Sequence, residues 1–94
     1  MYPSCYVEFS YTGKPREGIL VEMVNVNEDK ERWLVATEFG MRTFYRKNVE
    51  SGIASQPVLG ENHKRFMNAL QKAQPEMVDK YVLPVVNQYV LKRG

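Results

Sequence analysis

Few side chains in this sequence are able to do acid–base or metal chemistry. The chain contains one cysteine, Cys5, and one histidine, His63. A metal site needs several thiolate, imidazole or carboxylate ligands at fixed spacing, which this pair does not supply. A Cys–His nucleophile pair would require the two residues to meet in space. Cys5 alternates with Val7 and Phe9, however, and therefore reads as a small buried hydrophobe.

His63 stands near an expected helix start, which is typical of an edge or partly solvated histidine. The glycines are scattered, and no phosphate-cradling loop of the G-x-x-x-x-G-K type occurs. Three acidic residues, Glu28, Asp29 and Glu31, lie in a polar turn where we expect them to be solvated. We therefore expect a protein that is not an enzyme and that uses no metal and no cofactor.

The basic residues are the stronger candidates for a binding site. Guanidinium groups match phosphate oxygens with two hydrogen bonds at once, and an exposed tyrosine can stack on a base. In a curled sheet, the first turn would approach the end of the fourth strand, where Tyr45 points to solvent. The candidate ligand-binding residues are Arg42, Arg46, Lys47, Tyr45, Lys14 and Arg16. The alternative is that these cations are solubilising charges that face Glu8, Glu22 and Glu38 across strands.

Length and composition limit the size and location of the protein. With 94 residues and 44% hydrophobic content, we expect a single domain over residues 1–94. The net charge of +2 is uneven, because residues 1–58 carry seven basic and eight acidic groups whereas residues 59–94 carry six and three. No apolar run approaches the ~20 residues that span a bilayer, and one cysteine suits a reducing compartment. These features favour a cytoplasmic protein without a membrane partner.

The first part of the chain, residues 1–58, alternates with period two and predicts antiparallel strands. The apolar face of the first strand holds Cys5, Val7, Phe9 and Tyr11, with Tyr6 on the opposite, polar face. Further strands are expected at Ile19 to Val26, Trp33 to Phe39 and Arg42 to Lys47. The last two strands would be joined by a tight connection at Gly40-Met41. A short helical turn or loop is expected at Asn48 to Gly52. Trp33, Val35, Thr37 and Phe39 share one face, which indicates core, and Phe44 is expected opposite them. Such a meander must curl to cover its apolar face, so we expect a small antiparallel β-barrel of four to five strands.

The second part, residues 59–94, changes to helical periodicity. Apolar residues recur at three and four from Glu61, and Pro75 suits the first turn of a second helix. The second helix would bury Met77, Val78, Tyr81, Val82, Val85 and Tyr89. Pro84 is unfavourable within a helix, so residues 85–91 are either helix, which we prefer, or a closing strand. The expected fold class is α+β, a small β-barrel followed by two C-terminal helices.

Residues 7–53 resemble the WYL domain, a ligand-sensing domain of bacterial and phage regulators. The family's "I-x-Y" strand is similar to Val7-Glu8-Phe9-Ser10-Tyr11. Its "W-Y-L-V-A" strand is similar to Trp33-Leu34-Val35-Ala36. Its "R-T-F-R-L-D-R-I" segment is similar to the segment from Arg42 to Arg46 and on to Val49. The resemblance implies a small barrel of the Sm or Src-homology type. It also implies a nucleotide-like or single-stranded nucleic-acid ligand, held by Arg42 and Arg46 with Lys47 in addition.

Together, these features predict a non-enzymatic regulatory module that binds nucleic acid or a nucleotide through a basic patch. The alternative is a protein-interaction adaptor or inhibitor, as a phage or accessory protein would be. It would bind a partner protein or form a homodimer through Tyr81, Val85, Tyr89 and Leu91.

Overall fold

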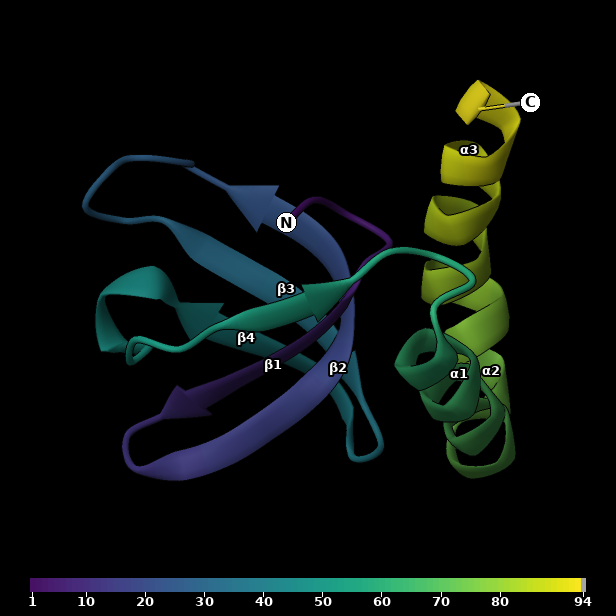
Figure 1. Cartoon of the computed structure of the whole chain (residues 1–94), viewed down its shortest axis with the longest axis horizontal. Helices are drawn as coiled ribbons and strands as arrows, with labels where there is room; N and C mark the ends of the chain where they lie inside the picture. Colours follow the sequence, from purple (N-terminus) through teal and green to yellow (C-terminus); the bar gives the residue numbers. More distant parts are fainter. Residues whose placement is uncertain (94) are drawn as a thin grey trace.

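The computed structural model describes residues 1–93, and side chains as far as residue 90. It contains one antiparallel five-stranded sheet in the order β4-β3-β2-β1-β5 (Figure 1). The strands are β1 (Tyr6–Tyr11), β2 (Lys14–Val24), β3 (Arg32–Thr37), β4 (Gly40–Tyr45) and β5 (Ala54–Gln56). The helices are the 3-10 turn η1 (Arg46–Asn48), α1 (Glu61–Ala73), α2 (Pro75–Met77), the π-helical turn η2 (Val78–Val82) and α3 (Leu83–Arg93). The predicted α+β class is confirmed, whereas closure of the sheet into a barrel stays a prediction.

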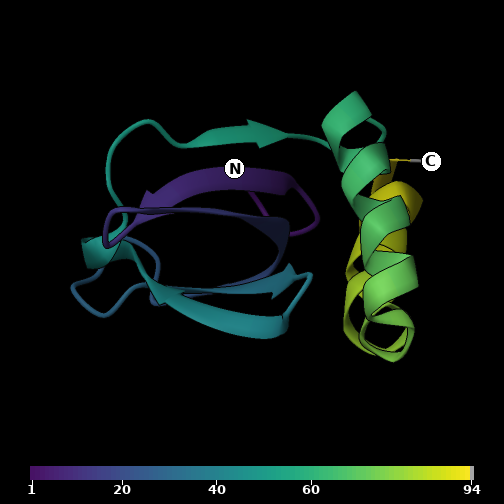
Figure 2. The same cartoon turned by 90° about the horizontal axis from the view of Figure 1, so that it is seen from below.

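The sheet curls around an inner core, which lies on the side that faces away from the helices (Figure 2). Trp33 is fully buried there, and the ring of Phe9 packs edge-on against the rings of both Trp33 and Phe44, at 5.5 and 5.0 Å between centroids. The buried members of the inner core are Cys5, Val7, Phe9, Leu20, Trp33, Val35, Phe44 and Val49. The predicted core positions of Cys5, Trp33 and Phe44 are therefore confirmed.

A second core lies between the sheet and the helices, which form a layer at one end of the strands (Figures 1 and 2). Tyr6 was predicted on a polar face, but its side chain is 1% exposed because the helices cover that face. Its ring centroid is 5.5 Å from that of Phe66 in α1. The buried members of this helix-facing core are Tyr6, Ile19, Ala36, Phe66, Leu70, Met77, Val78 and Val82.

Strand β2 carries the bend that lets one sheet border both cores. A register shift lies between Leu20 and Glu22, opposite β3. Just before it, Gly18 packs so closely on β3 that a Cβ atom would lie 2.3 Å from Val35 Cγ1 and 2.5 Å from the Ala36 carbonyl oxygen. Only glycine allows this approach of two backbones.

Two further expectations, both for residues in the turns between strands, are wrong. β3 ends at Thr37, so Phe39 falls in the turn before Gly40 and is 80% exposed instead of joining the core. The turn residue Glu31 is buried, because its carboxylate accepts hydrogen bonds from Trp33 Nε1–H at 2.7 Å and from the Asn27 N–H at 2.8 Å. A buried carboxylate is tolerated when such donors replace water.

The helical layer follows the predicted break at Gln74-Pro75 and continues as a helix past Pro84. Proline lacks an N–H group and its ring crowds the preceding turn. The π-helical turn η2 precedes it, and the Leu83 N–H bonds to the Val78 carbonyl five residues back, which is a known way to absorb such a disruption. The strand alternative for residues 85–91 is therefore wrong. In the described part of the chain, no helix is long and apolar enough to cross a membrane.

Candidate anion-binding site

Two of the predicted site residues, Arg16 and Arg42, line one pocket beside the inner core. Arg16 pairs with Phe9 across β1 and β2, and Arg42 pairs with Val35 across β3 and β4. Directly paired residues project to the same side of a sheet, so both guanidinium groups belong to the inner side. The Arg16 guanidinium carbon lies 5.9 Å from the centroid of the Phe44 ring, within the range of a cation–π contact.

These two arginines line a pocket of about 220 Å³. The pocket lies between the start of β2, the β3–β4 turn and helix α1. The exposed ring of Phe39 stands on its wall and offers a flat apolar face. Its lining residues are Pro15, Arg16, Glu17, Thr37, Glu38, Phe39, Arg42, Phe44 and Phe66.

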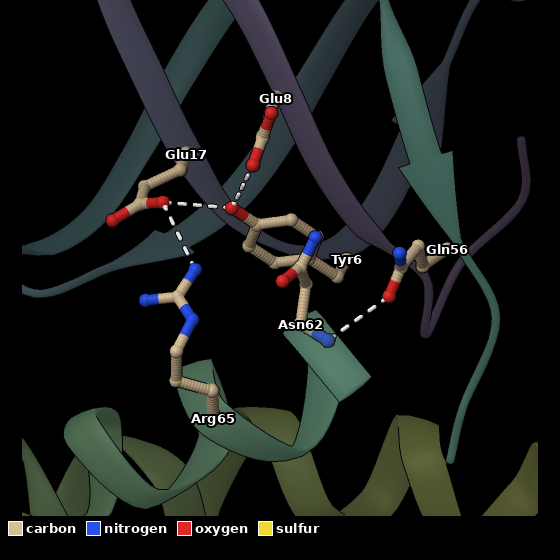
Figure 3. Close-up of polar contacts among 6 residues, drawn as sticks. All are labelled: Tyr6, Glu8, Glu17, Gln56, Asn62 and Arg65. Atoms are coloured by element: carbon tan, nitrogen blue, oxygen red, sulfur yellow. Dashed lines mark hydrogen bonds and ion pairs between the residues drawn. The ribbon is translucent and has the colours of Figure 1, made fainter. Parts of the chain in front are cut away.

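The pocket is lined by two guanidinium groups and two carboxylates, but the carboxylate of Glu17 is already engaged. Glu17 Oε2 accepts a hydrogen bond from the Tyr6 hydroxyl at 2.7 Å and lies 3.9 Å from Arg65 Nη2 (Figure 3). Within residues 1–93, neither Arg16 nor Arg42 has a carboxylate oxygen within 4.0 Å. The predicted pairing of the cations with Glu8, Glu22 and Glu38 is therefore not found in this described part.

Arg46 does not join Arg16 and Arg42. Its guanidinium carbon lies 5.8 Å from the Trp33 ring centroid, and its Nη1 donates to the Val49 carbonyl at 3.3 Å. Arg42 lies within β4, whereas Arg46 begins the 3-10 turn η1 that follows this strand. Arg46 is not among the residues that line the pocket of Arg16 and Arg42, and it lies over Trp33 instead, so a common patch for Arg42 and Arg46 stays a prediction.

The other three candidates also lie outside the pocket lining. Lys14 is exposed at the β1–β2 turn, and Lys47 is exposed in η1. Tyr45 is 45% exposed, as expected of a solvent-facing phenol, but it projects from the opposite side of β4 to Arg42 and Phe44. Its backbone N–H donates to the Tyr11 hydroxyl at 3.3 Å. The exposed aromatic ring in the pocket of Arg16 and Arg42 is that of Phe39, which was predicted to join the core.

A buried tyrosine connects the pocket to helix α1. The Tyr6 hydroxyl lies 2.6 Å from Glu8 Oε1 and 2.7 Å from Glu17 Oε2 (Figure 3). Burial and the two neighbouring carboxylates raise the pKa of the Tyr6 phenol far above its usual range, so the hydroxyl keeps its hydrogen. Nearby, the N–H of Asn62 in the first turn of α1 donates to the Gln56 side-chain oxygen at 3.0 Å. Sequence reasoning missed this network because it placed Tyr6 in solvent.

His63 lies in α1, whereas Cys5 directly precedes β1. The His63 ring is buried, and its Nε2 lies 2.8 Å from the Ser4 carbonyl oxygen, which fixes Nε2 as the donor. Burial lowers the pKa of His63, and the backbone hydrogen bond opposes this only in part. The Cys5 thiol belongs to the inner core. Among residues 1–93, no group of three histidine, cysteine or acidic side chains is placed to hold a metal ion.

Comparison of the chain with protein families, with curated proteins and with solved structures finds no match. The resemblance to WYL domains stays a prediction.

Proposed function

We propose that this protein is a non-enzymatic binding module for an anionic ligand, a nucleotide or single-stranded nucleic acid. One observation carries the proposal: Arg16 and Arg42 line a single pocket beside the 80% exposed ring of Phe39. Two guanidinium groups offer bidentate hydrogen bonds to a phosphate. An exposed phenyl ring offers a stacking surface to a base, which free phosphate would not use.

The carboxylate of Glu38 also suits a nucleotide better than a simple anion. Glu38 lines the pocket next to Phe39. A carboxylate accepts hydrogen bonds from base amino groups or from ribose hydroxyls, and it repels a bare phosphate. A ligand that carries both an anionic group and hydrogen-bond donors therefore complements this pocket.

The test is a fluorescence-anisotropy titration with a labelled single-stranded oligonucleotide at low salt and at rising salt. Arg42→Ala and Arg16→Ala should each weaken binding about tenfold and reduce the salt slope by about one. Phe39→Ala should weaken binding without changing the salt slope, because stacking releases no counterions. The matched control is Arg32→Ala, since Arg32 is an exposed arginine of the same sheet and lines a different depression. Undetectable binding at low salt, or equal losses in the control, would contradict the proposal.

A protein-interaction adaptor is the second proposal, and the same exposed Phe39 supports it, because such a ring can anchor a partner protein. The self-association version has less support. Tyr89 stacks on Tyr2 within the chain, with ring centroids 5.3 Å apart, although Tyr81 remains 42% exposed. The Leu91 side chain lies outside the described side chains. A pull-down with and without nuclease separates nucleic-acid binding from protein partnership, and light scattering tests for a homodimer.

The finer expectations belong to the same proposal. We propose a cytoplasmic, regulatory protein whose curled sheet closes into a small barrel of the Sm or Src-homology type, as the WYL resemblance implies. The succession of β4, the 3-10 turn η1 and β5, together with the bridge between Tyr11 and Val49, supports closure.

A further inference from the structure

We infer that helix α1 sets the charge of the pocket, because Arg65 is a positioning residue that holds the Glu17 carboxylate on the helix side. This inference rests on the proposed binding of an anion by Arg16 and Arg42. Glu17 is the residue that follows Arg16 in the chain, and both line the pocket. The placement of the Glu17 carboxylate therefore decides how much positive charge an incoming phosphate meets.

The geometry shows which groups hold this carboxylate. Glu17 Oε2 faces the Tyr6 hydroxyl at 2.7 Å and Arg65 Nη2 at 3.9 Å (Figure 3). The side chains of Glu17 and Arg65 are 43% and 59% exposed, so the pair lies at the surface, where the Glu17 side chain has room to turn. The pair thus joins the rim of the pocket to the first half of α1.

Tyr6 alone does not secure Glu17, because a phenol has one hydrogen to donate. The Tyr6 hydroxyl lies 2.6 Å from Glu8 as well, so two carboxylates compete for that single hydrogen. When the hydrogen goes to Glu8, Arg65 is the remaining cation beside Glu17. Arg65 also offsets the repulsion between the two carboxylates.

The consequence for the ligand follows from the same charges. Without Arg65, the Glu17 carboxylate is freed to turn toward Arg16 and Arg42. It would then occupy the guanidinium groups that we propose for phosphate, and binding would have to displace it. Arg65 needs no contact with the ligand to have this effect.

The chain supplies a matched control on the same helix. Successive residues of an α-helix are rotated by about 100°, so Lys64 and Arg65 project from different flanks of α1. Lys64 is exposed as well, and no interaction is found for its side chain in the described part. Lys64→Ala therefore removes one positive charge from α1 without touching Glu17.

The experiment is a double-mutant cycle, with a fluorescein-labelled oligoriboadenylate as the probe at low salt. Arg65→Ala should weaken binding about two- to fivefold, the range of an exposed ion pair, and Lys64→Ala should weaken it less. Arg65→Lys should restore most of the affinity, because it restores the charge. In a Glu17→Gln background, the loss from Arg65→Ala should shrink to that of Lys64→Ala, because no carboxylate charge remains to be held. Thermal melts of all variants check that the fold is retained.

Each result has a defined meaning. Equal losses from Arg65→Ala in both backgrounds would show that Arg65 contacts the ligand directly and would overturn the inference. Unchanged binding in Arg65→Ala would overturn it as well. In both cases the proposed function survives, because the wild-type chain still binds the probe. Failure of the wild-type chain to bind would remove the proposed function and this inference together.

Discussion

The two cores of this protein share one sheet but differ in what they contain. The members of the inner core are apolar and aromatic side chains, centred on Trp33 and Phe9, and one buried carboxylate, that of Glu31, accepts a hydrogen bond from Trp33 beside them. The helix-facing core includes the tyrosine ring of Tyr6, and the histidine His63 is buried on the same helix as Phe66. The phenol of Tyr6 and the imidazole of His63 therefore lie between the sheet and the helices, where a change in pH or in nearby charge can affect them.

The comparison shows why β1 departs from simple alternation. In a strand with one wet face, buried and exposed residues alternate. In β1, Tyr6 and Val7 are both buried, because Val7 faces the inner core and Tyr6 faces the helices. The helical layer therefore makes the start of β1 a two-sided buried strand, and its polar atoms have to find partners inside the protein.

Removal of a large ring from the helix-facing core should have the largest effect. Phe66→Ala is expected to lower the free energy of unfolding by about 3–5 kcal/mol, because the ring is fully buried and a cavity would remain. Trp33 is the single tryptophan and reports on the inner core. We expect its fluorescence and the far-UV circular dichroism to change together in urea, because β1, β2 and β3 belong to both cores. Separate transitions would show that the two cores unfold independently.

The close approach of β2 and β3 gives the next largest effect. Gly18→Ala would place a Cβ atom against the Ala36 carbonyl, which is backbone and cannot rotate away. We expect a loss of about 3 kcal/mol, the upper part of the range for overpacking. Gly13→Ala is the control: its φ of +80° is strained for alanine, but there is open space around it, so the loss should be about 1 kcal/mol. Urea midpoints measure both, and similar losses would contradict the packing argument.

The sequence predicted the inner core better than the helix-facing core, and the reason is physical. Trp33, Val35 and Phe44 were recognisable because alternation marks one face of a strand. Tyr6 was assigned to solvent, since the pattern of a single strand carries no information on a second layer that covers its other face. The helical periodicity after Glu61 did predict that a helix exists, and the apolar residues Phe66 and Leu70 of that helix are buried.

The candidate site was only partly predictable, for a similar reason. Arg16 and Arg42 were both nominated, but whether they meet depends on how far the sheet curls, which Gly18 and the bulge in β2 decide. Phe39 was missed because the strand that starts near Trp33 was predicted to end at Phe39, two residues beyond its end at Thr37. The sequence placed the turn at Gly40-Met41, whereas the turn in the structure already includes Glu38 and Phe39, directly before Gly40.

Loss of one hydroxyl group should have a smaller effect on stability. Tyr6→Phe keeps the ring in the helix-facing core but leaves Glu8 and Glu17 without their shared donor. We expect a loss of about 1–2 kcal/mol, typical of a hydrogen bond to a charged acceptor. Tyr11→Phe is the matched control beside the inner core, since the Tyr11 hydroxyl accepts only long contacts of 3.3 and 3.4 Å from Tyr45 and Asn48. Equal losses in the two variants would argue that the Tyr6 network adds nothing to the stability of the fold.

The smallest expected effect is a dependence of stability on pH that belongs to the helix-facing side alone. Burial lowers the pKa of His63 in the folded chain below the ordinary value of about 6.5, which the unfolded chain keeps. As pH falls below about 6.5, the unfolded state therefore takes up a proton before the folded state does, and the free energy of unfolding decreases. Above this pH, both states carry a neutral imidazole and the contribution is constant.

Urea unfolding between about pH 5 and pH 7.5 measures this dependence above the range in which most carboxylates titrate. His63→Gln keeps a side-chain N–H that can donate to the Ser4 carbonyl, and it has no group that titrates in this interval. The wild-type chain should lose stability toward pH 5, whereas the variant should give a flat profile. The inner core holds no histidine. If the variant keeps the same dependence of unfolding free energy on pH as the wild-type chain, another group titrates in this interval. His63 would then take up its proton as readily in the folded as in the unfolded chain.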